Sequence, residues 1–215
     1  MKDKFKIGFI DEDPLQVKKY QRELREEFDV IGYKIDDGLT IDDLLSQVYA
    51  SEIDLLMVDF LMKDSGIVTY NGDEVVRRYE KIKPRFPMII FTNEENQAFP
   101  VVDNPNIIYK KEDVLNKPET FFEILRKNIH LYTDYIEEKK TLIAALMAKE
   151  ALTAKEKHQL SEAQFELRNL DKWAVEAPSQ LLEERNVDKL SKTTREAEEF
   201  LAKMIKQLKD GPTER

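Results

Sequence analysis

Short apolar runs alternate with longer amphipathic stretches through the first half of the chain. The runs are rich in β-branched and aromatic side chains, which is typical of buried parallel strands. The stretches between them carry apolar residues at helical spacing. This alternation predicts right-handed βαβ units and an α/β fold with a doubly wound, five-stranded parallel sheet. In chain order the runs are FKIGFI, VIGYKI, IDLLMV, PMIIF and NIIY.

Polar residues at the edges of the amphipathic stretches mark where helices begin. Asp13 before Pro14 predicts an N-cap and a first helix that runs to about Phe28. Thr40, with Asp43 three residues later, indicates a second helix start. A third helix is expected over residues 73–82, after a polar loop.

The second half of the chain carries helical patterns only. Apolar residues at three- and four-residue spacing predict a long helix from Pro118, and Thr153 with Glu156 predicts a capping box that opens another. Pro178 interrupts the chain before a third stretch, and a last helix is expected over residues 197–208. We therefore expect a domain over residues 1–130 and an all-α bundle or coiled-coil extension over residues 131–215.

Charge narrows the classes of partner. The net charge is -9, and residues 1–116 carry 16 basic against 24 acidic residues, a net of -8. An acidic chain is poorly suited to nucleic acid or to anionic membranes, so neither is an expected partner. The absence of Cys excludes disulfides and thiol catalysis. No apolar run is long enough to cross a bilayer. We therefore expect the chain to be cytoplasmic.

Four of the apolar runs end in polar residues that suit one kind of chemistry. Asp11 with Glu12, Asp59, Thr92 and Lys110 follow the runs in that order. The carboxyl ends of parallel strands share one edge of a sheet, so these side chains are expected to meet there. A carboxylate can attack phosphorus, and phosphoryl transfer needs cations and hydrogen-bond donors held around the spreading charge. The pattern predicts a phosphorylation site.

These residues also resemble a known family. The segments IGFIDEDP and DLLMVDFLM, the pair FT at 91–92 and the run IIYK ending at Lys110 are similar to receiver domains of two-component response regulators, over roughly residues 4–130. The resemblance implies a flavodoxin-like sheet with strand order 2-1-3-4-5. It also implies that Asp59 is the phosphoacceptor, that Thr92 and Lys110 bind the phosphoryl group, and that a sensor histidine kinase or phosphotransfer protein is the donor.

A magnesium ion is the expected cofactor. Mg²⁺ prefers oxygen ligands and usually keeps several waters. The expected ligands are Glu12, Asp59 and the backbone carbonyl of Leu61, with Asp11 acting through a water molecule.

The sequence departs from the family pattern at several places. Lys110 is followed by Lys111 where the family has Pro, so the usual cis peptide is not expected and either lysine is able to reach the site. Ile107 occupies the position at which many family members have an aromatic side chain that rotates on phosphorylation. The segment between Thr92 and Lys110 is short and contains Pro100 and Pro105, so the helix there is expected to be a stub. We therefore expect the effect of phosphorylation to be transmitted through the helix that begins at Pro118.

The favoured hypothesis is a phosphorylation-controlled switch that acts through protein-protein contacts, as a homodimer or with another protein. Its only chemistry would be its own phosphorylation and dephosphorylation, so it is not expected to be an enzyme. The alternative is a pseudo-receiver that is never phosphorylated and serves as a scaffold. A DNA-binding regulator is less favoured, because LTAKEKHQL lacks a turn Gly and local basicity. His130 and His158 are interpreted as packing or surface residues.

Overall fold

A computed structural model gives the structure of residues 4–176. Contacts divide the chain into two compact units, residues 1–138 and 139–215. The sequence pattern placed the boundary between residues 130 and 131. The two units are described separately below.

The first unit contains a five-stranded, all-parallel sheet in the order β2-β1-β3-β4-β5. The predicted fold class and strand order are confirmed. Apolar side chains fill both faces of the central strands, and every residue of β3 and β4 is buried. The strands are β1 (Phe5–Ile10), β2 (Phe28–Gly32), β3 (Leu55–Val58), β4 (Met88–Thr92) and β5 (Ile108–Lys110).

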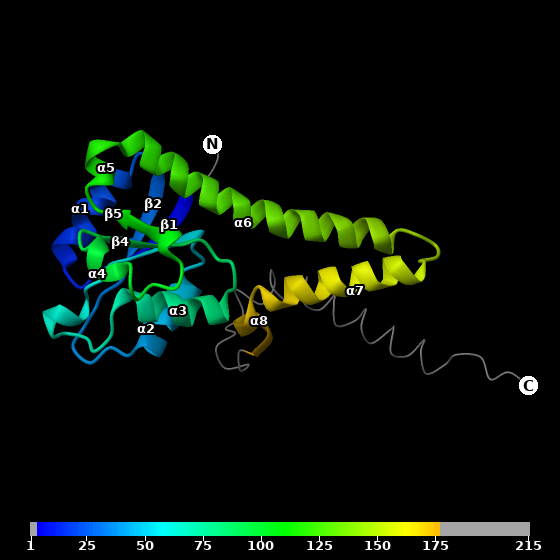
Figure 1. Cartoon of the computed structure of the whole chain (residues 1–215), viewed down its shortest axis with the longest axis horizontal. Coiled ribbons are helices and arrows are strands. Elements are labelled where there is room, and N and C mark those ends of the chain that lie inside the picture. The colour runs from blue at the N-terminus through cyan, green and yellow to red at the C-terminus, as the bar shows by residue number, and fades with distance from the viewer. Residues whose placement is uncertain (1–3, 177–215) are drawn as a thin grey trace, which may run out of the picture. The chain divides into compact units, whose positions relative to one another are not determined.

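Helices cover both faces of this sheet (Figure 1). Side chains from α1 and from the first turns of α6 form one core with Ile7, Phe9 and Phe91, whereas α2 and α3 lie on the other face. The helices of this unit are α1 (Pro14–Leu24), α2 (Ile41–Ala50), α3 (Gly72–Ile82), α4 (Glu95–Ala98), α5 (Asp113–Asn116) and the start of α6 (Pro118–Met147), with 3₁₀ turns η1 (Lys63–Ser65) and η2 (Pro105–Ile107).

The predicted helix starts are confirmed by their caps. The side chain of Asp13 accepts a hydrogen bond from the backbone N–H of Leu15, and that of Thr40 accepts one from Asp43. The first helix ends at Leu24, earlier than predicted. Phe28 is already part of β2, because it pairs with Phe5 and packs beside Phe122.

The connection between β4 and β5 is short, as expected. The helix α4 has four residues and β5 has three, whereas α6 has 30 residues. Because α6 starts in the core of the first unit and ends in the second, one continuous helix joins the two.

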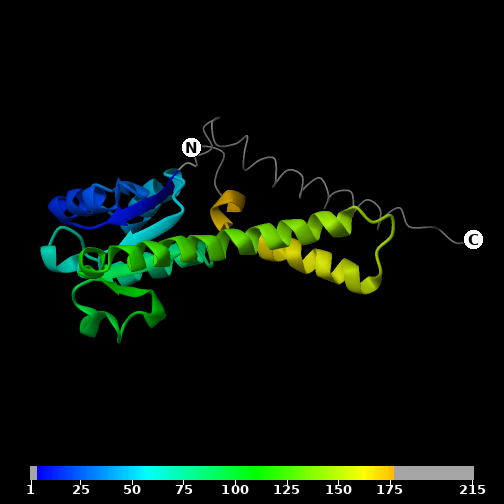
Figure 2. The same cartoon turned by 90° about the horizontal axis from the view of Figure 1, so that it is seen from above.

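The second unit contains the distal part of α6, then α7 (Ala154–Asn169) and α8 (Lys172–Glu176). Figure 2 shows α7 running back along the end of α6, and ion pairs join Lys139 to Glu166 and Lys149 to Glu156. The predicted capping box of Thr153 and Glu156 opens α7. The stretch after Pro178 and the helix predicted over residues 197–208 lie outside the described residues.

None of the helices within residues 4–176 is long and apolar enough to cross a membrane.

Candidate functional site

Two buried aspartates lie at the carboxyl edge of the sheet. Asp11 follows β1 and Asp59 follows β3, and these strands are neighbours in the sheet. Asp11 is 3% exposed and Asp59 is 6% exposed, although carboxylates are rarely buried without a partner. Each therefore needs a positive charge or hydrogen-bond donors close by.

Lys111 provides that positive charge. Its Nζ atom lies 2.8 Å from Oδ2 of Asp11 and 2.7 Å from Oδ1 of Asp59. Burial by itself lowers the pKa of Lys111, but the nearby carboxylates of Asp59 and Asp11 outweigh it, so the pKa is raised and the ammonium stays charged. One cation therefore bridges both aspartates.

The position of Lys111 is fixed through its backbone. Its N–H donates to the carbonyl of Thr92 at 3.1 Å, and its carbonyl accepts from the hydroxyl of Tyr20 at 3.3 Å. The ring of Tyr20 is buried edge-on against Phe9 and Phe91, so the hydroxyl comes from a rigid part of the core.

Lys110 does not take the role predicted for it. Its ammonium pairs with Glu95 of α4 at 2.8 Å, and its side chain is 50% exposed. Successive side chains of a strand point in opposite directions, so adjacent lysines at the end of β5 cannot both reach the aspartates. The structure therefore places Lys111, and not Lys110, beside the two aspartates.

Glu12 adds a third carboxyl group beside the two aspartates. Burial, followed by repulsion from Asp59 and Asp11, raises its pKa from 4.5 to about 7. Its Oε2 atom is buried and has no hydrogen-bond partner among the described residues. Burial also raises the pKa of Asp11, against the opposing effect of Lys111.

Thr92 and Leu61 are the remaining predicted site residues at the carboxyl edge of the sheet. Thr92 ends β4, is 2% exposed, and its hydroxyl accepts a hydrogen bond from the N–H of Glu94 at 3.0 Å. The N–H of Leu61 donates to Oδ2 of Asp59 at 3.0 Å. Each carboxylate oxygen of Asp59 therefore has a partner, which is the ammonium of Lys111 for Oδ1 and the N–H of Leu61 for Oδ2.

Gly72 is a site residue that the sequence pattern did not reveal. Its N–H donates to the carbonyl of Phe60, and a Cβ placed on it would lie 2.1 Å from the carbonyl oxygen of Asp59. Only glycine allows α3 to begin so close to the backbone that carries Asp59. The only signal was a Gly before an expected helix, which also occurs in ordinary turns.

The carboxyl groups at this edge fit a magnesium ion. Within residues 4–176, no three acidic, His or Cys side chains gather at metal-binding spacing, so they form no cage of side chains. Mg²⁺ is usually held by one or two carboxylates together with waters and phosphate oxygens. The partnerless buried oxygen of Glu12, beside two aspartates, meets that requirement.

No protein-family model and no curated protein sequence matches the chain. Solved structures do match it. The crystal structure of adenylate cyclase from Rhodopirellula baltica aligns with 64% of this chain and 98% of its own, with 20% identity and a TM-score of 0.51. The likeness is one of fold.

Receiver domains are also among the matched structures. The signal receiver domain of an HD domain-containing protein from Pseudomonas fluorescens Pf-5 aligns with 59% of this chain and 93% of its own, at 13% identity and a TM-score of 0.43. The BeF3-activated DrrB receiver domain covers 59% of this chain and 98% of its own, at 19% identity and a TM-score of 0.43. The first unit has the strand order 2-1-3-4-5 of the flavodoxin-like fold. We call residues 1–138 the receiver-like unit.

Proposed function

We propose that the chain is a phosphorylation-controlled switch in which Asp59 accepts a phosphoryl group from a histidine kinase or phosphotransfer protein. The observation that carries this proposal is the buried Asp59 carboxylate with the ammonium of Lys111 2.7 Å away. A carboxylate at the carboxyl edge of a doubly wound sheet lies where such folds bind ligands. The chain would phosphorylate and dephosphorylate itself and act on no other substrate.

The proposed reaction needs little covalent chemistry from the protein. An Asp59 oxygen forms a bond to phosphorus, the P–N bond of the donor phosphohistidine breaks, and the released imidazole takes up a proton. Lys111 then pairs with the new phosphoryl oxygens, and Thr92 turns its hydroxyl toward them as a donor. Both groups stabilise negative charge where it develops.

Magnesium is part of the proposal. When bound, Mg²⁺ would neutralise phosphoryl charge, and Glu12 and Asp59 would hold it, with Asp11 through water and with the carbonyl of Leu61. Glu12 and Asp11 also crowd Asp59 with negative charge, so neutralisation is required before an anionic donor approaches.

The switch would reach the second unit through α6. Phe121, Leu125 and Ile129 of this helix are buried in the core of the receiver-like unit, and Leu146 of the same helix is buried near its other end. A shift of one order of magnitude between two states needs only about 1.4 kcal/mol of differential stability. The output would be contact with a protein partner or with a second copy through the C-terminal helices.

The direct test is phosphorylation by acetyl phosphate and Mg²⁺, measured by intact-protein mass. We expect one phosphoryl adduct on the wild-type protein and on Asp64→Asn, and none on Asp59→Asn. Asp64 is a suitable control because it is exposed in the loop that follows Asp59. No adduct on the wild type, or an adduct that persists in Asp59→Asn, would refute the proposal.

One observation favours a second function, a scaffold that is never phosphorylated. Lys111 already pairs with both aspartates, so each of these buried carboxylates has a cationic partner without phosphate. Beryllofluoride with Mg²⁺ separates the two functions, because a phosphoryl mimic stabilises only a protein that binds it. A rise in melting temperature that Asp59→Asn abolishes supports the switch, and an unchanged melting temperature supports the scaffold.

A further inference from the structure

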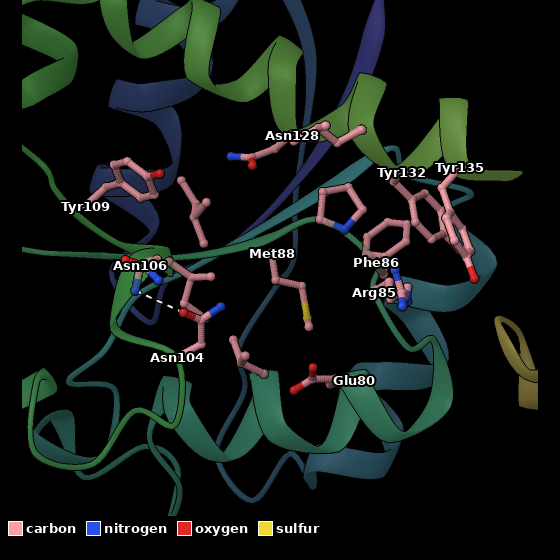
Figure 3. A pocket seen from close by; sticks show the side chains of 15 residues that line it. Glu80, Arg85, Phe86, Met88, Asn104, Asn106, Tyr109, Asn128, Tyr132 and Tyr135 are labelled. Atoms are coloured by element: carbon pink, nitrogen blue, oxygen red, sulfur yellow. Dashed lines mark hydrogen bonds between the residues drawn. The ribbon is translucent and has the colours of Figure 1, made fainter. Parts of the chain in front are cut away.

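The part of α6 that follows Ile129 leaves the core of the receiver-like unit. Phe121, Leu125 and Ile129 are buried, whereas none of residues 130–138 is buried. A depression of about 420 Å³ adjoins this part of the helix, between α6, α3 and the start of β4 (Figure 3). Apolar packing therefore holds the first turns of α6, and the later turns depend on contacts at the rim of the depression.

Two aromatic residues of α6 make contacts at this rim. The guanidinium carbon of Arg85 lies 4.5 Å from the ring centroid of Tyr135, which is a cation–π arrangement. The rings of Phe86 and Tyr132 meet edge to face, with their centroids 5.6 Å apart. Figure 3 shows these four side chains gathered on one side of the depression. Arg85 and Phe86 belong to the short segment between α3 and β4, at the amino edge of the sheet.

Arg85 has a backbone conformation that favours glycine. Its φ is 66°, and it lies in a turn in which the N–H of Phe86 donates to the carbonyl of Lys83 at 3.2 Å. Pro84 is the second residue of this turn, and a positive φ at the third residue is usually adopted by Gly or Asn. Arginine is strained at this position, and a strained residue often marks a functional role for its side chain. The stack on Tyr135 gives the arginine side chain such a role.

This stack is weak enough to open while the sheet stays folded. Arg85 is exposed, and a cation–π contact at an exposed site contributes less free energy than the burial of a leucine or phenylalanine in the core. Breaking the stack leaves Phe121, Leu125 and Ile129 in their apolar surroundings. The later turns of α6 are therefore able to open locally without unfolding of the receiver-like unit.

We propose that Arg85 and Tyr135 form a clamp that holds residues 130–138 of α6 in the helix, and that this segment opens when the clamp is released. Residues 118–129 stay in the core in both states. The clamp is a conformational device that sets the stiffness of α6 just before the helix enters the second unit. It lies at the amino edge of the sheet, whereas Asp59 lies at the carboxyl edge, so the inference does not depend on phosphorylation.

Hydrogen exchange of the full chain, measured by mass spectrometry segment by segment, tests the clamp. Arg85→Ala removes the guanidinium, and Tyr135→Ala removes the ring at a helical position that suits alanine. The double variant shows whether the two residues act through each other. Arg78→Ala is the matched control, because Arg78 is an exposed arginine of α3 that pairs with Asp42.

We expect exchange over residues 130–138 to rise about two- to fivefold in Arg85→Ala, which is the size of a cation–π contact at an exposed site. It should rise at least as much in Tyr135→Ala, with no further rise in the double variant and no change in Arg78→Ala. Three results would overturn the inference: no rise in either single variant, a further rise in the double variant, or an equal rise over residues 118–129.

Arg85→Gly tests the strain in the turn separately. Glycine adopts a positive φ without strain, so this variant should lose the clamp as Arg85→Ala does and yet unfold at a higher urea concentration than Arg85→Ala. Unfolding at a lower urea concentration than Arg85→Ala would show that residue 85 is not strained, and would contradict the reason for an arginine at this position.

Discussion

At the scale of single residues, the site depends on one ammonium group shared by two carboxylates. Lys111 lies within 2.8 Å of both Asp11 and Asp59. A buried charge that loses its partner is strongly destabilising, so the three groups act together.

The first prediction compares two adjacent lysines. Lys111→Ala should slow phosphorylation by acetyl phosphate at least about tenfold, because it removes a cation aimed at the developing charge. Lys110→Ala should change the rate less than about twofold, since Lys110 pairs with Glu95 outside the site. Rates come from the time course of the intact-protein mass, after circular dichroism has shown that each variant is folded. Equal effects of the two substitutions would contradict the assignment of Lys111.

The second prediction concerns pH. The pKa of Glu12 is raised to about 7 in the folded protein, so the folded state keeps a proton that the unfolded chain has lost. The protonated Glu12 therefore contributes its full stabilisation at low pH, and this contribution is lost as the pH rises from about 4.5 to 7. The free energy of unfolding should fall by about 1 to 2 kcal/mol over this range, after solvent screening is allowed for. Urea unfolding at pH 5 and pH 8 measures the change.

Glu12→Gln supplies the comparison for this titration. Its amide cannot ionise, so the loss of stability between pH 5 and pH 8 should shrink relative to the wild type. A pH dependence identical in both proteins would show that Glu12 does not titrate in this range.

At the scale of elements, α3 begins against the loop that holds Asp59. Gly72→Ala would place a Cβ 2.1 Å from the backbone oxygen of Asp59, which cannot move without shifting the site. We expect the free energy of unfolding to fall by about 2 to 4 kcal/mol and phosphorylation to slow as well.

Gly66→Ala is the matched control for Gly72→Ala. Gly66 has a φ of 74°, but a Cβ there meets no atom within 4 Å. This substitution should cost about 1 to 2 kcal/mol from backbone strain alone and leave the phosphorylation rate unchanged. Denaturant unfolding of both variants separates crowding at Asp59 from a general effect of losing a glycine.

The sequence predicted those elements whose signals are local. The apolar runs identified four of the strands, whereas the second run, VIGYKI, was placed too late, because β2 spans Phe28–Gly32. Asp13, Thr40 and Thr153 marked helix starts because their caps depend on residues two or three positions away. The choice between Lys110 and Lys111 depends on where a three-residue strand pairs with β4, and a shift of one residue reverses every side chain.

At the scale of the whole chain, α6 is the covalent link between the two units. It spans Pro118–Met147, and the division between the units falls within it, at Glu138 and Lys139. If the switch proposal holds, a break in this helix should separate phosphoryl binding from its effect on the second unit.

Glu138→Pro provides this break at an exposed position, and Glu138→Ala is its control. Proline removes a hydrogen bond and clashes with the preceding turn, at a cost of about 3 kcal/mol to the helix. We expect beryllofluoride to stabilise the receiver-like unit in both variants. A change in hydrogen exchange of α7 on adding beryllofluoride should occur in the wild type and Glu138→Ala only. Its persistence in Glu138→Pro would exclude α6 as the route.

The contact between Tyr109 and Phe121 has a consequence for the pair of lysines that follows it. The two ring centroids are 6.2 Å apart, and Tyr109 packs against the core on the α6 side of the sheet. If β5 slipped by one position, Lys110 would replace Lys111 between the acids, but this ring would leave its apolar neighbours. The aromatic anchor, rather than any difference between two chemically identical amines, therefore determines which of them enters the acidic pocket.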